Sequence, residues 1–461
     1  MTVRNINLVL PLSQKDTAMR IMETADSNQN VSSAVTPLIG ENLRQSDIDS
    51  KTQRSTPLIQ VMPGTRISTM ATRTTIIRTM SSALEPSADQ YARHHADFSF
   101  QELVQAYLDC RKNKRNTSSA LAFEQDLERN LIKLYDELQD CTYQPGKSIC
   151  FVITRPKPRE VWAADFRDRI VHHLFYNRIS PRFYASFIAD SCACIPGRGT
   201  LYAAKRLESK IRSATENWRK SCLYLKCDLA NFFVAIDKNI LRDQVAKKVT
   251  EPYWLWLSDL ILFHDPRLNY ELRGNADLLN LVPTHKRLVN HSSNLGLPIG
   301  NLSSQFFANI YLNALDQFIK HQIGAKYYIR YVDDFALLHE SPQWLNHALD
   351  RINEFLLSKL NAKLNPTKTI LQPVGRGVDF VGQVIKPWRR YTRKRTVNEA
   401  ISQVRKAPAS KLFEMANSYF GLLGQANKSH HDRAMLANEL RCKGYKVNFK
   451  LTKTYRKKAA A

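Results

Sequence analysis

Two adjacent aspartates interrupt an apolar stretch of the chain, KYYIRYVDDFALL at residues 326–338. The β-branched and aromatic residues before Asp333 and the apolar residues after Asp334 predict a β-hairpin with both acids at its turn. Adjacent carboxylates repel each other, and apolar flanks draw them toward the interior, where an uncompensated charge is costly. By itself the pair is compatible with an ordinary aspartate turn and with a metal site.

A third carboxylate ends a second apolar run, CLYLKCDLANFFVAID at residues 222–237. Asp228 follows strand-forming residues, and a sheet can bring the end of that strand beside the hairpin turn. A helix N-cap is an equally simple explanation for Asp228 alone. Three carboxylates around one point form a hard oxygen site suited to Mg²⁺, which keeps positions open for substrate phosphates. Two such ions can activate a 3′-hydroxyl and stabilise a leaving pyrophosphate.

The charge of the chain is concentrated at its C-terminal end. The 461 residues carry a net charge of +25. Residues 386–461 hold 19 Lys and Arg against 4 Asp and Glu, a net charge of +15 in 76 residues. Such a basic segment is typical of a protein with a polyanionic partner, and nucleic acid is the interpretation we favour over a merely soluble basic surface.

Composition also predicts the compartment. No run of about 18 apolar residues is present, so we expect neither a transmembrane helix nor a membrane partner. The N-terminus lacks a signal-peptide pattern. The eight Cys are scattered without paired CxxC motifs, which favours reduced thiols in a cytoplasmic protein.

The elements that must position the carboxylates mix helices and strands without regular alternation, which predicts an α+β fold. Helical spacing predicts at least two helices in 99–140, a buried helix at 253–263, a long amphipathic helix at 303–323 and a helix at 344–360. Residues 148–170 predict a strand, a basic turn and a helix, and residues 223–229 a strand. Residues 1–90 contain no Phe, Tyr or Trp and predict a flexible extension.

Three ordered blocks resemble reverse transcriptases: LKCDLANFF, then GLPIGNLSSQFFANIYLNALDQFIKH, then YIRYVDDFALL. The resemblance extends from about residue 99 to residue 425. It implies a right-hand polymerase fold with fingers, a palm whose antiparallel sheet carries the YVDD hairpin, and a helical thumb. The implied ranges are 91–220 for the fingers with N-terminal helices, 221–385 for the palm and 386–461 for the basic thumb and C-terminal region.

The resemblance implies an RNA-directed DNA polymerase that uses two Mg²⁺ ions, for which Mn²⁺ can substitute. Its substrates are an RNA template, a DNA or RNA primer and dNTPs. The implied metal ligands are Asp228, Asp333, Asp334 and the backbone carbonyl of Leu229. Lys368 is the implied proton donor to pyrophosphate.

The resemblance also implies nucleotide contacts. The basic turn of FVITRPKPREVWAADFRDRIVHH places Lys157 and Arg159 at the incoming triphosphate. Phe233 matches an aromatic steric gate that excludes a ribose 2′-hydroxyl, with an ordinary core Phe as the alternative. The loop GLPIGNLSSQ contributes Ile299, Gly300 and Gln305, and the absent side chain of Gly300 lets a template–primer base pair approach the backbone.

Further arginines are implied contacts to template and primer. Arg167 and Arg169 are such candidates in the fingers, with structural or surface salt-bridge roles as the alternative. The basic run WRRYTRKR contributes Arg389, Arg390, Arg393 and Arg395. The alternative for this run is a solvent-facing hairpin directed away from the groove.

The version IGN..SQ of the loop resembles the enzymes of diversity-generating retroelements, because many retroviral and intron enzymes have Gln in place of Ile299 and Pro in place of Gln305. A phage-defence reverse transcriptase that works with a structured non-coding RNA or an accessory protein is the second interpretation. A nucleotidyl cyclase-like palm and an inactive RNA-binding scaffold are more remote alternatives. The sequence does not predict the oligomeric state.

Overall fold

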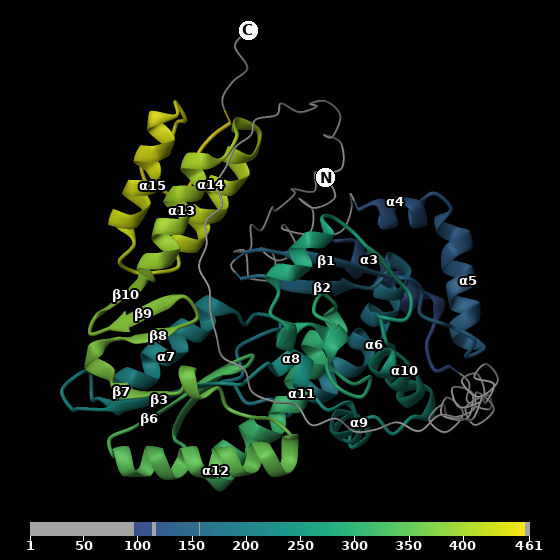
Figure 1. The fold of residues 1–461 in the computed structure, drawn as a ribbon, viewed down its shortest axis with the longest axis horizontal. Helices are drawn as coiled ribbons and strands as arrows, with labels where there is room; N and C mark the ends of the chain where they lie inside the picture. The colour runs from purple at the N-terminus through teal and green to yellow at the C-terminus, as the bar shows by residue number, and fades with distance from the viewer. Residues whose placement is uncertain (1–95, 113–116, 156, 457–461) are drawn as a thin grey trace, which may run out of the picture. The chain divides into compact units, whose positions relative to one another are not determined.

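The computed structural model describes residues 96–112, 117–155 and 157–456, and Figure 1 shows how its helices and strands are arranged. The extension predicted for residues 1–90 lies outside this range. Within the described part of the chain, every helix is too short or too polar to cross a bilayer.

Three helices and a strand pair precede the central sheet. They are α3 (Phe100–Arg111), α4 (Ser118–Glu124), α5 (Leu127–Gln139), β1 (Ser148–Ile153) and β2 (Arg159–Ala163), followed by α6 (Phe166–Tyr184). The helices confirm the prediction for residues 99–140. The prediction for 148–170 missed β2, which pairs antiparallel with β1 and is buried from Glu160 to Ala163. Its apolar run is short and continues almost directly into α6, so the sequence pattern did not separate strand from helix.

The central sheet is antiparallel and has the strand order β5-β6-β3-β7. Its strands are β3 (Leu223–Asp228), β5 (Tyr327–Tyr331), β6 (Asp334–His339) and β7 (Ile370–Pro373). Strands β5 and β6 form the predicted hairpin, with Val332 and Asp333 between them. The mixed architecture and the sheet with the YVDD hairpin confirm the predicted fold class.

Helices cover both faces of this sheet. Because side chains alternate along a strand, Leu225 and Leu337 belong to one core while Tyr224 and Leu338 belong to another. The first core includes α11 (Leu302–Gln317) and α12 (Pro342–Leu360), and the second includes α7 (Thr200–Ala214). Between β3 and α11 the chain forms α8 (Phe232–Ala235), α9 (Lys238–Ala246) and α10 (Pro252–Phe263).

Helix α11 differs from the amphipathic helix predicted at residues 303–323. Eleven of its sixteen residues are buried, so it lies inside the core rather than on its surface. The buried residues include polar ones such as Asn309 and Asp316, and these polar residues gave the sequence an amphipathic pattern. A π-helical turn, Phe318–Gln322, follows it.

The long segment at 265–295 adds a strand to the β1–β2 pair. Strand β4 (Tyr270–Leu272) runs parallel to β1, with Tyr270 opposite Ser148 and Leu272 opposite Cys150. Leu288 packs with Cys150 and Trp162, and its backbone N–H donates to the Glu160 carboxylate. The segment is therefore built into the β1–β2 sheet.

The C-terminal part begins with strands and continues as helices. Strands β8 (Val378–Phe380), β9 (Gln383–Lys386) and β10 (Arg389–Thr392) form one antiparallel sheet. Helices α13 (Lys394–Lys406), α14 (Ala409–Leu423) and α15 (His430–Cys442) follow and share a core of their own (Figure 1). The helical part thus begins at Lys394, because residues 389–392 pair with β9.

A buried ion pair connects α11 to the hairpin. Arg330 and Asp316 are 1% and 0% exposed, and their charged groups lie 2.6 Å apart. Tyr328 donates a hydrogen bond to Asp316, and Arg330 donates further bonds to Asn309 and to the backbone carbonyl of Val332. The hydrogen bonds satisfy both charges, which a buried pair needs in order to be tolerated.

We predict that Asp316→Asn lowers the free energy of unfolding by about 3–5 kcal/mol, because Arg330 then remains buried without a counter-charge. Denaturant unfolding followed by circular dichroism measures the change. Glu439→Gln is the matched control, since it removes the partner of the exposed Arg405 and should change the unfolding midpoint little. Equal effects of the two substitutions would contradict a dominant role for the buried pair.

Candidate active site

The sheet register brings the three predicted carboxylates together. Asp228, the last residue of β3, lies directly opposite Asp334, the first residue of β6. Asp333 occupies the turn just before it. Val332 adopts the left-handed φ of 55°, and Arg330 donates to its carbonyl at 3.1 Å, so the buried pair described above also fixes the turn.

Burial and mutual repulsion shape the protonation of these acids. Burial raises the pKa of Asp333 to about 6, and the charges of Asp228 and Asp334 add to the rise. Burial also raises the pKa of Asp334, with Lys226 opposing and Asp228 reinforcing the shift. Neighbouring carboxylates in a desolvated site disfavour the ionised form, and a cation between them removes this penalty.

Two lysines partly compensate the acidic centre. Lys368 lies 2.5 Å from Asp228, and Lys226 lies 3.9 Å from Asp334. The sequence analysis singled out Lys368 but missed Lys226. The signal was present, because Lys226 precedes Asp228 by two residues on one strand, and such residues face the same side of a sheet.

The backbone around Leu229 is fixed by residues far along the chain. Asn365 N–H donates to the Asp228 carbonyl at 2.7 Å, and Ala230 N–H donates to the Lys363 carbonyl at 2.8 Å. Leu229 and Leu364 thereby form an isolated antiparallel bridge. The pairing fixes the residue whose carbonyl is the fourth predicted metal ligand.

The donor set is compatible with a divalent cation, although its side chains are not arranged as a finished metal site. Among the residues described, no group of three or more His, Cys, Asp or Glu side chains is placed to hold an ion. Lys368 and Lys226 balance the charge of the carboxylates instead. Carboxylate and carbonyl oxygens are the ligands that Mg²⁺ and Mn²⁺ prefer, and the raised pKa of Asp333 reflects burial first and the negative charges of Asp228 and Asp334 second.

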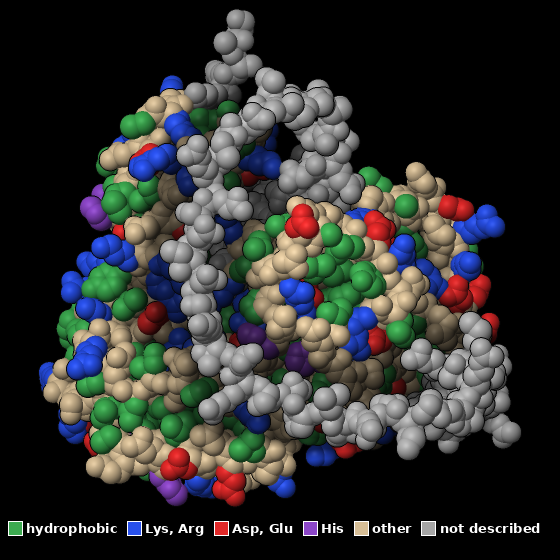
Figure 2. Space-filling model, in the orientation of Figure 1, with side chains coloured by type: hydrophobic (Ala, Val, Ile, Leu, Met, Phe, Trp, Pro, Cys, Tyr) green, Lys and Arg blue, Asp and Glu red, His purple; other side chains and the backbone are tan. Residues whose placement is uncertain are grey.

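A cluster of cations surrounds the predicted triphosphate-binding lysine. Burial lowers the pKa of Lys157, and four neighbouring positive charges lower it further. These neighbours are Lys368, Lys286, Arg395 and Arg159. Figure 2 shows Lys and Arg side chains gathered in the hollow near the middle of the visible face. Cations from four separate segments are thus neighbours, an arrangement suited to binding phosphates.

Lys286 was not predicted as part of this cluster. It ends a short 3₁₀ turn, Thr284–Lys286, within the segment that β4 and Leu288 attach to the β1–β2 sheet. Nothing in its local sequence indicates a phosphate contact, because its position depends on the packing of the whole segment.

The loop before α11 is bound to β2. Trp162 N–H donates to the Ile299 carbonyl at 2.7 Å. Gly300 has a φ of 133°, and a Cβ on it would lie 2.8 Å from Val161 and 3.0 Å from the Trp162 carbonyl. The close approach that requires Gly300 in this structure is therefore to β2, and the approach of a base pair to its backbone stays a prediction.

Two other predicted nucleotide contacts have distinctive surroundings. Phe232 is buried, whereas its neighbour Phe233 is only partly buried and its carbonyl accepts from Leu297 N–H at 2.7 Å. Phe232 is thus the core residue of the pair. The Oε1 atom of Gln305 is buried and accepts no hydrogen bond from the described residues.

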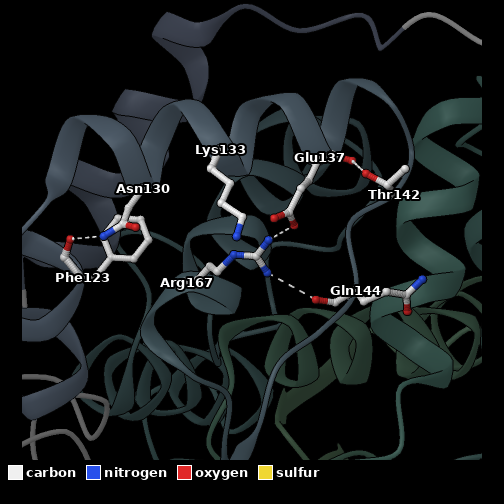
Figure 3. Close-up of a pocket in the computed structure, with 7 residues that line it drawn as sticks. All are labelled: Phe123, Asn130, Lys133, Glu137, Thr142, Gln144 and Arg167. Atoms are coloured by element: carbon white, nitrogen blue, oxygen red, sulfur yellow. Dashed lines mark hydrogen bonds and ion pairs between the residues drawn. The ribbon is translucent and has the colours of Figure 1, made fainter.

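The predicted template contacts of α6 are built into the helical layer. The Arg167 guanidinium pairs with Glu137 of α5, donates to the Gln144 carbonyl and lies over the Tyr143 ring. Arg167 lines a cavity of about 530 Å³. Figure 3 shows it pointing toward Glu137, with Lys133 beside it. Arg167 therefore has the structural salt-bridge role that the sequence left as the alternative. Arg169 is partly buried in the same helix.

The four arginines of the basic run do not act alike. Arg390 is 5% exposed, pairs with Glu208 of α7 at 2.7 Å and donates to Gln383, so the expectation of a phosphate contact is wrong for this residue. Arg393 pairs with Asp379. Arg389 and Arg395 are exposed. Strand β10 causes the difference between Arg389 and Arg390, because alternate residues of a strand face opposite sides.

Comparison with known proteins identifies the family. The model of the family described as reverse transcriptase (RNA-dependent DNA polymerase) matches residues 155–385, half of the chain. The chain belongs to this family. The enzyme class predicted from the sequence, an RNA-directed DNA polymerase, is the class that defines the family.

Solved structures of telomerases are among those similar to the chain. One is apo telomerase from Candida tropicalis truncated from its C-terminal domain, at 14% identity and a TM-score of 0.38, covering 53% of this chain and 54% of that one. Another is telomerase from Candida albicans in complex with a TWJ fragment of telomeric RNA, at 13% identity and a TM-score of 0.35, covering 65% and 54%. The chain thus spans about half the length of each. No curated protein matches the chain.

We predict that the double variant Arg389→Gln/Arg395→Gln flattens the slope of log affinity against log salt by roughly 1.5 units for template–primer, at about 0.7–0.9 per phosphate contact. Its unfolding midpoint should stay close to that of the parent chain. Fluorescence anisotropy at several salt concentrations measures the slope.

Arg390→Gln is the matched comparison. It removes the ion pair between the buried Arg390 and the partly buried Glu208, so it should destabilise the fold while the folded fraction keeps the parent salt slope. A flattened slope in Arg390→Gln with unchanged stability would contradict the structural role assigned to this arginine.

Proposed function

We propose that the protein synthesises DNA on an RNA template by metal-dependent nucleotidyl transfer. The observation that carries the proposal is the convergence of Asp228, Asp333 and Asp334 at one end of the sheet, beside the cation cluster around Lys157. An acidic centre next to a phosphate-binding cluster suits the joining of a primer hydroxyl to a nucleoside triphosphate. The family of the chain supports the same reaction class.

Asp228, Asp333, Asp334 and the Leu229 carbonyl would hold two Mg²⁺ ions, for which Mn²⁺ can substitute. When bound, the ions supply activation of the primer 3′-hydroxyl and stabilisation of the negative charge on the leaving pyrophosphate. Lys157 and Arg159 bind the triphosphate, and Lys286 joins them from the segment at 265–295. Lys368 donates a proton to the departing pyrophosphate. For this, Lys368 must first leave its ion pair with Asp228.

The remaining proposed contacts select and align the nucleotide. Phe233 acts as the steric gate against a 2′-hydroxyl, since its ring is only partly committed to the core. Ile299 and Gln305 lie at the nascent base pair, and the unsatisfied Oε1 of Gln305 offers a buried acceptor there. Arg389 and Arg395 hold the phosphates of the template and of a DNA or RNA primer.

The proposed ranges for the parts of the polymerase are those of the sequence analysis: fingers at 91–220, palm at 221–385 and thumb at 386–461. The helices of the thumb start at Lys394. Residues 389–392 belong by pairing to the sheet that precedes them.

For the biological role we propose a diversity-generating retroelement of bacterial type, because Ile299 and Gln305 match the loop version of those enzymes. A phage-defence enzyme that works with a non-coding RNA or an accessory protein is the second candidate, favoured by the segment at 265–295 that extends the β1–β2 sheet. Sequencing of the nucleic acid that copurifies with the chain distinguishes them. A repeat-flanked coding target supports the first, and one abundant structured RNA supports the second.

We predict that Asp333→Asn abolishes primer extension, with a loss of at least about a thousandfold, because a metal ligand charge disappears while the shape is kept. Extension of a labelled primer on an RNA template with Mg²⁺ or Mn²⁺ measures the loss. Asp350→Asn, an exposed change on α12, is the control and should retain activity. Primer extension by Asp333→Asn at close to the parent rate would contradict the assignment of the active site.

We predict that Phe233→Ala raises the incorporation of ribonucleotides relative to deoxynucleotides, since the ring no longer meets the 2′-hydroxyl. Competition between dNTP and rNTP in single-nucleotide extension gives the ratio. Unchanged selectivity with retained activity would assign Phe233 to packing and place the gate elsewhere.

A further inference from the structure

The chain after α15 forms a rigid turn that is attached to the C-terminal helices. Val447 and Thr454 form an isolated antiparallel bridge around it. The side-chain oxygen of Asn448 accepts hydrogen bonds from the backbone N–H of Thr452 and of Lys453, at 2.8 and 3.0 Å. Asn417 of α14 bonds to both the N–H and the carbonyl of Thr454. The turn is therefore held in one shape on a fixed support.

This turn presents an aromatic ring to solvent while its apolar anchor points inward. Leu451 is 6% exposed and packs in the core of the C-terminal helices, whereas Phe449, two residues earlier, is 99% exposed. The Arg433 guanidinium donates to the carbonyls of Lys450 and Leu451, which fixes the backbone just beyond the ring. A single exposed apolar residue is common, but here an ordered scaffold holds the ring entirely outside the protein.

The chain segment around Phe449 is basic. Residues 443–456 contain five Lys and Arg and no Asp or Glu. Lys446, Lys450 and Lys453 are exposed. Lys453 also lies over the ring of Tyr455, which is 46% exposed. The turn thus combines a bare aromatic face with a group of cations.

We propose that this turn, residues 446–455, binds unpaired nucleotides, with a base stacked on Phe449 and the flanking phosphates on Lys446, Lys450 and Lys453. Aromatic faces and cations together bind single-stranded nucleic acid with little sequence preference, since every base has a π-face and every nucleotide a phosphate. The inference rests on the proposed function only in that both concern nucleic acid. It adds a contact point beyond Arg389 and Arg395, remote in sequence from the carboxylates.

A single-stranded nucleic acid suits the turn better than a lipid surface does. Stable adsorption to a bilayer needs an extended apolar face, and within the turn Leu451 is buried, which leaves Phe449 as the fully exposed apolar side chain. One ring matches one base. RNA and DNA share this chemistry, so the test includes both.

The test compares full-length chains that carry Phe449→Ala, Phe449→Trp or Phe449→Leu. The probes are fluorescein-labelled oligouridylate, oligothymidylate and a blunt duplex, each followed by anisotropy. Phe449→Ala should weaken binding of both single strands about fivefold or more, Phe449→Trp should retain it, and Phe449→Leu should resemble Ala, because stacking requires a ring. Duplex affinity should stay unchanged. Leu268→Ala is the matched control, since Leu268 is also an exposed apolar residue, at 86%.

The lysines are tested separately. The triple variant Lys446→Gln/Lys450→Gln/Lys453→Gln should flatten the salt slope for single strands by roughly two units, at about 0.7 per phosphate, whereas Phe449→Ala should leave the slope unchanged. Parent affinity in Phe449→Ala, or equal binding by the Leu and Trp variants, would overturn the proposal. The proposal would also be overturned if Phe449→Ala weakened binding to vesicles that contain phosphatidylserine and left binding to the oligonucleotides unchanged. Asp333→Asn should bind the oligonucleotides normally. Failure of the active-site assignment can therefore be distinguished from failure of the proposal for the turn.

Discussion

The buried pair of Arg330 and Asp316 is the interaction on which the arrangement of the candidate site depends. It joins α11 to β5, and through the Val332 carbonyl it reaches the turn that carries Asp333. The Arg330 guanidinium also donates to Ser191, which anchors the segment before α7. Desolvating two charges is costly unless every polar atom is satisfied. That requirement leaves the hairpin few alternative positions relative to α11.

Charge in the site follows a simple order. A small acidic centre lies in a protein of strong positive charge. Lys226 of β3 and Lys368 before β7 lie beside its carboxylates, and Lys368 is also a neighbour of Lys157 in the basic group. Like charges are close together in both the acidic and the basic group. Metal ions would relieve the repulsion among the carboxylates, and substrate phosphates would relieve the repulsion among the cations.

Much of the central sheet could be predicted, because the apolar, strand-forming runs that end at Asp228 and flank Asp333 and Asp334 specify strands and their ends. The arginines of residues 389–395 show where prediction fails. Arg389 and Arg390 are identical neighbours in the sequence, and only the pairing of β10 with β9 separates an exposed residue from one buried against Glu208. Lys286 and the packing of Gly300 against β2 depend on contacts between distant segments, which no local pattern contains.

The parallel pairing of β4 with β1 has a consequence for how the chain folds. Residues 148–150 of β1 acquire their second neighbour from residues 270–272, which are synthesised after β3 and after helices α9 and α10. Contacts between residues so far apart in sequence are slow to form, because a long loop must close first. The β1–β2 sheet is therefore completed only after β3 and helices α9 and α10 have been synthesised. A fragment that ends at residue 220 lacks that strand, so its β1–β2 sheet stays incomplete until residues 270–272 are synthesised.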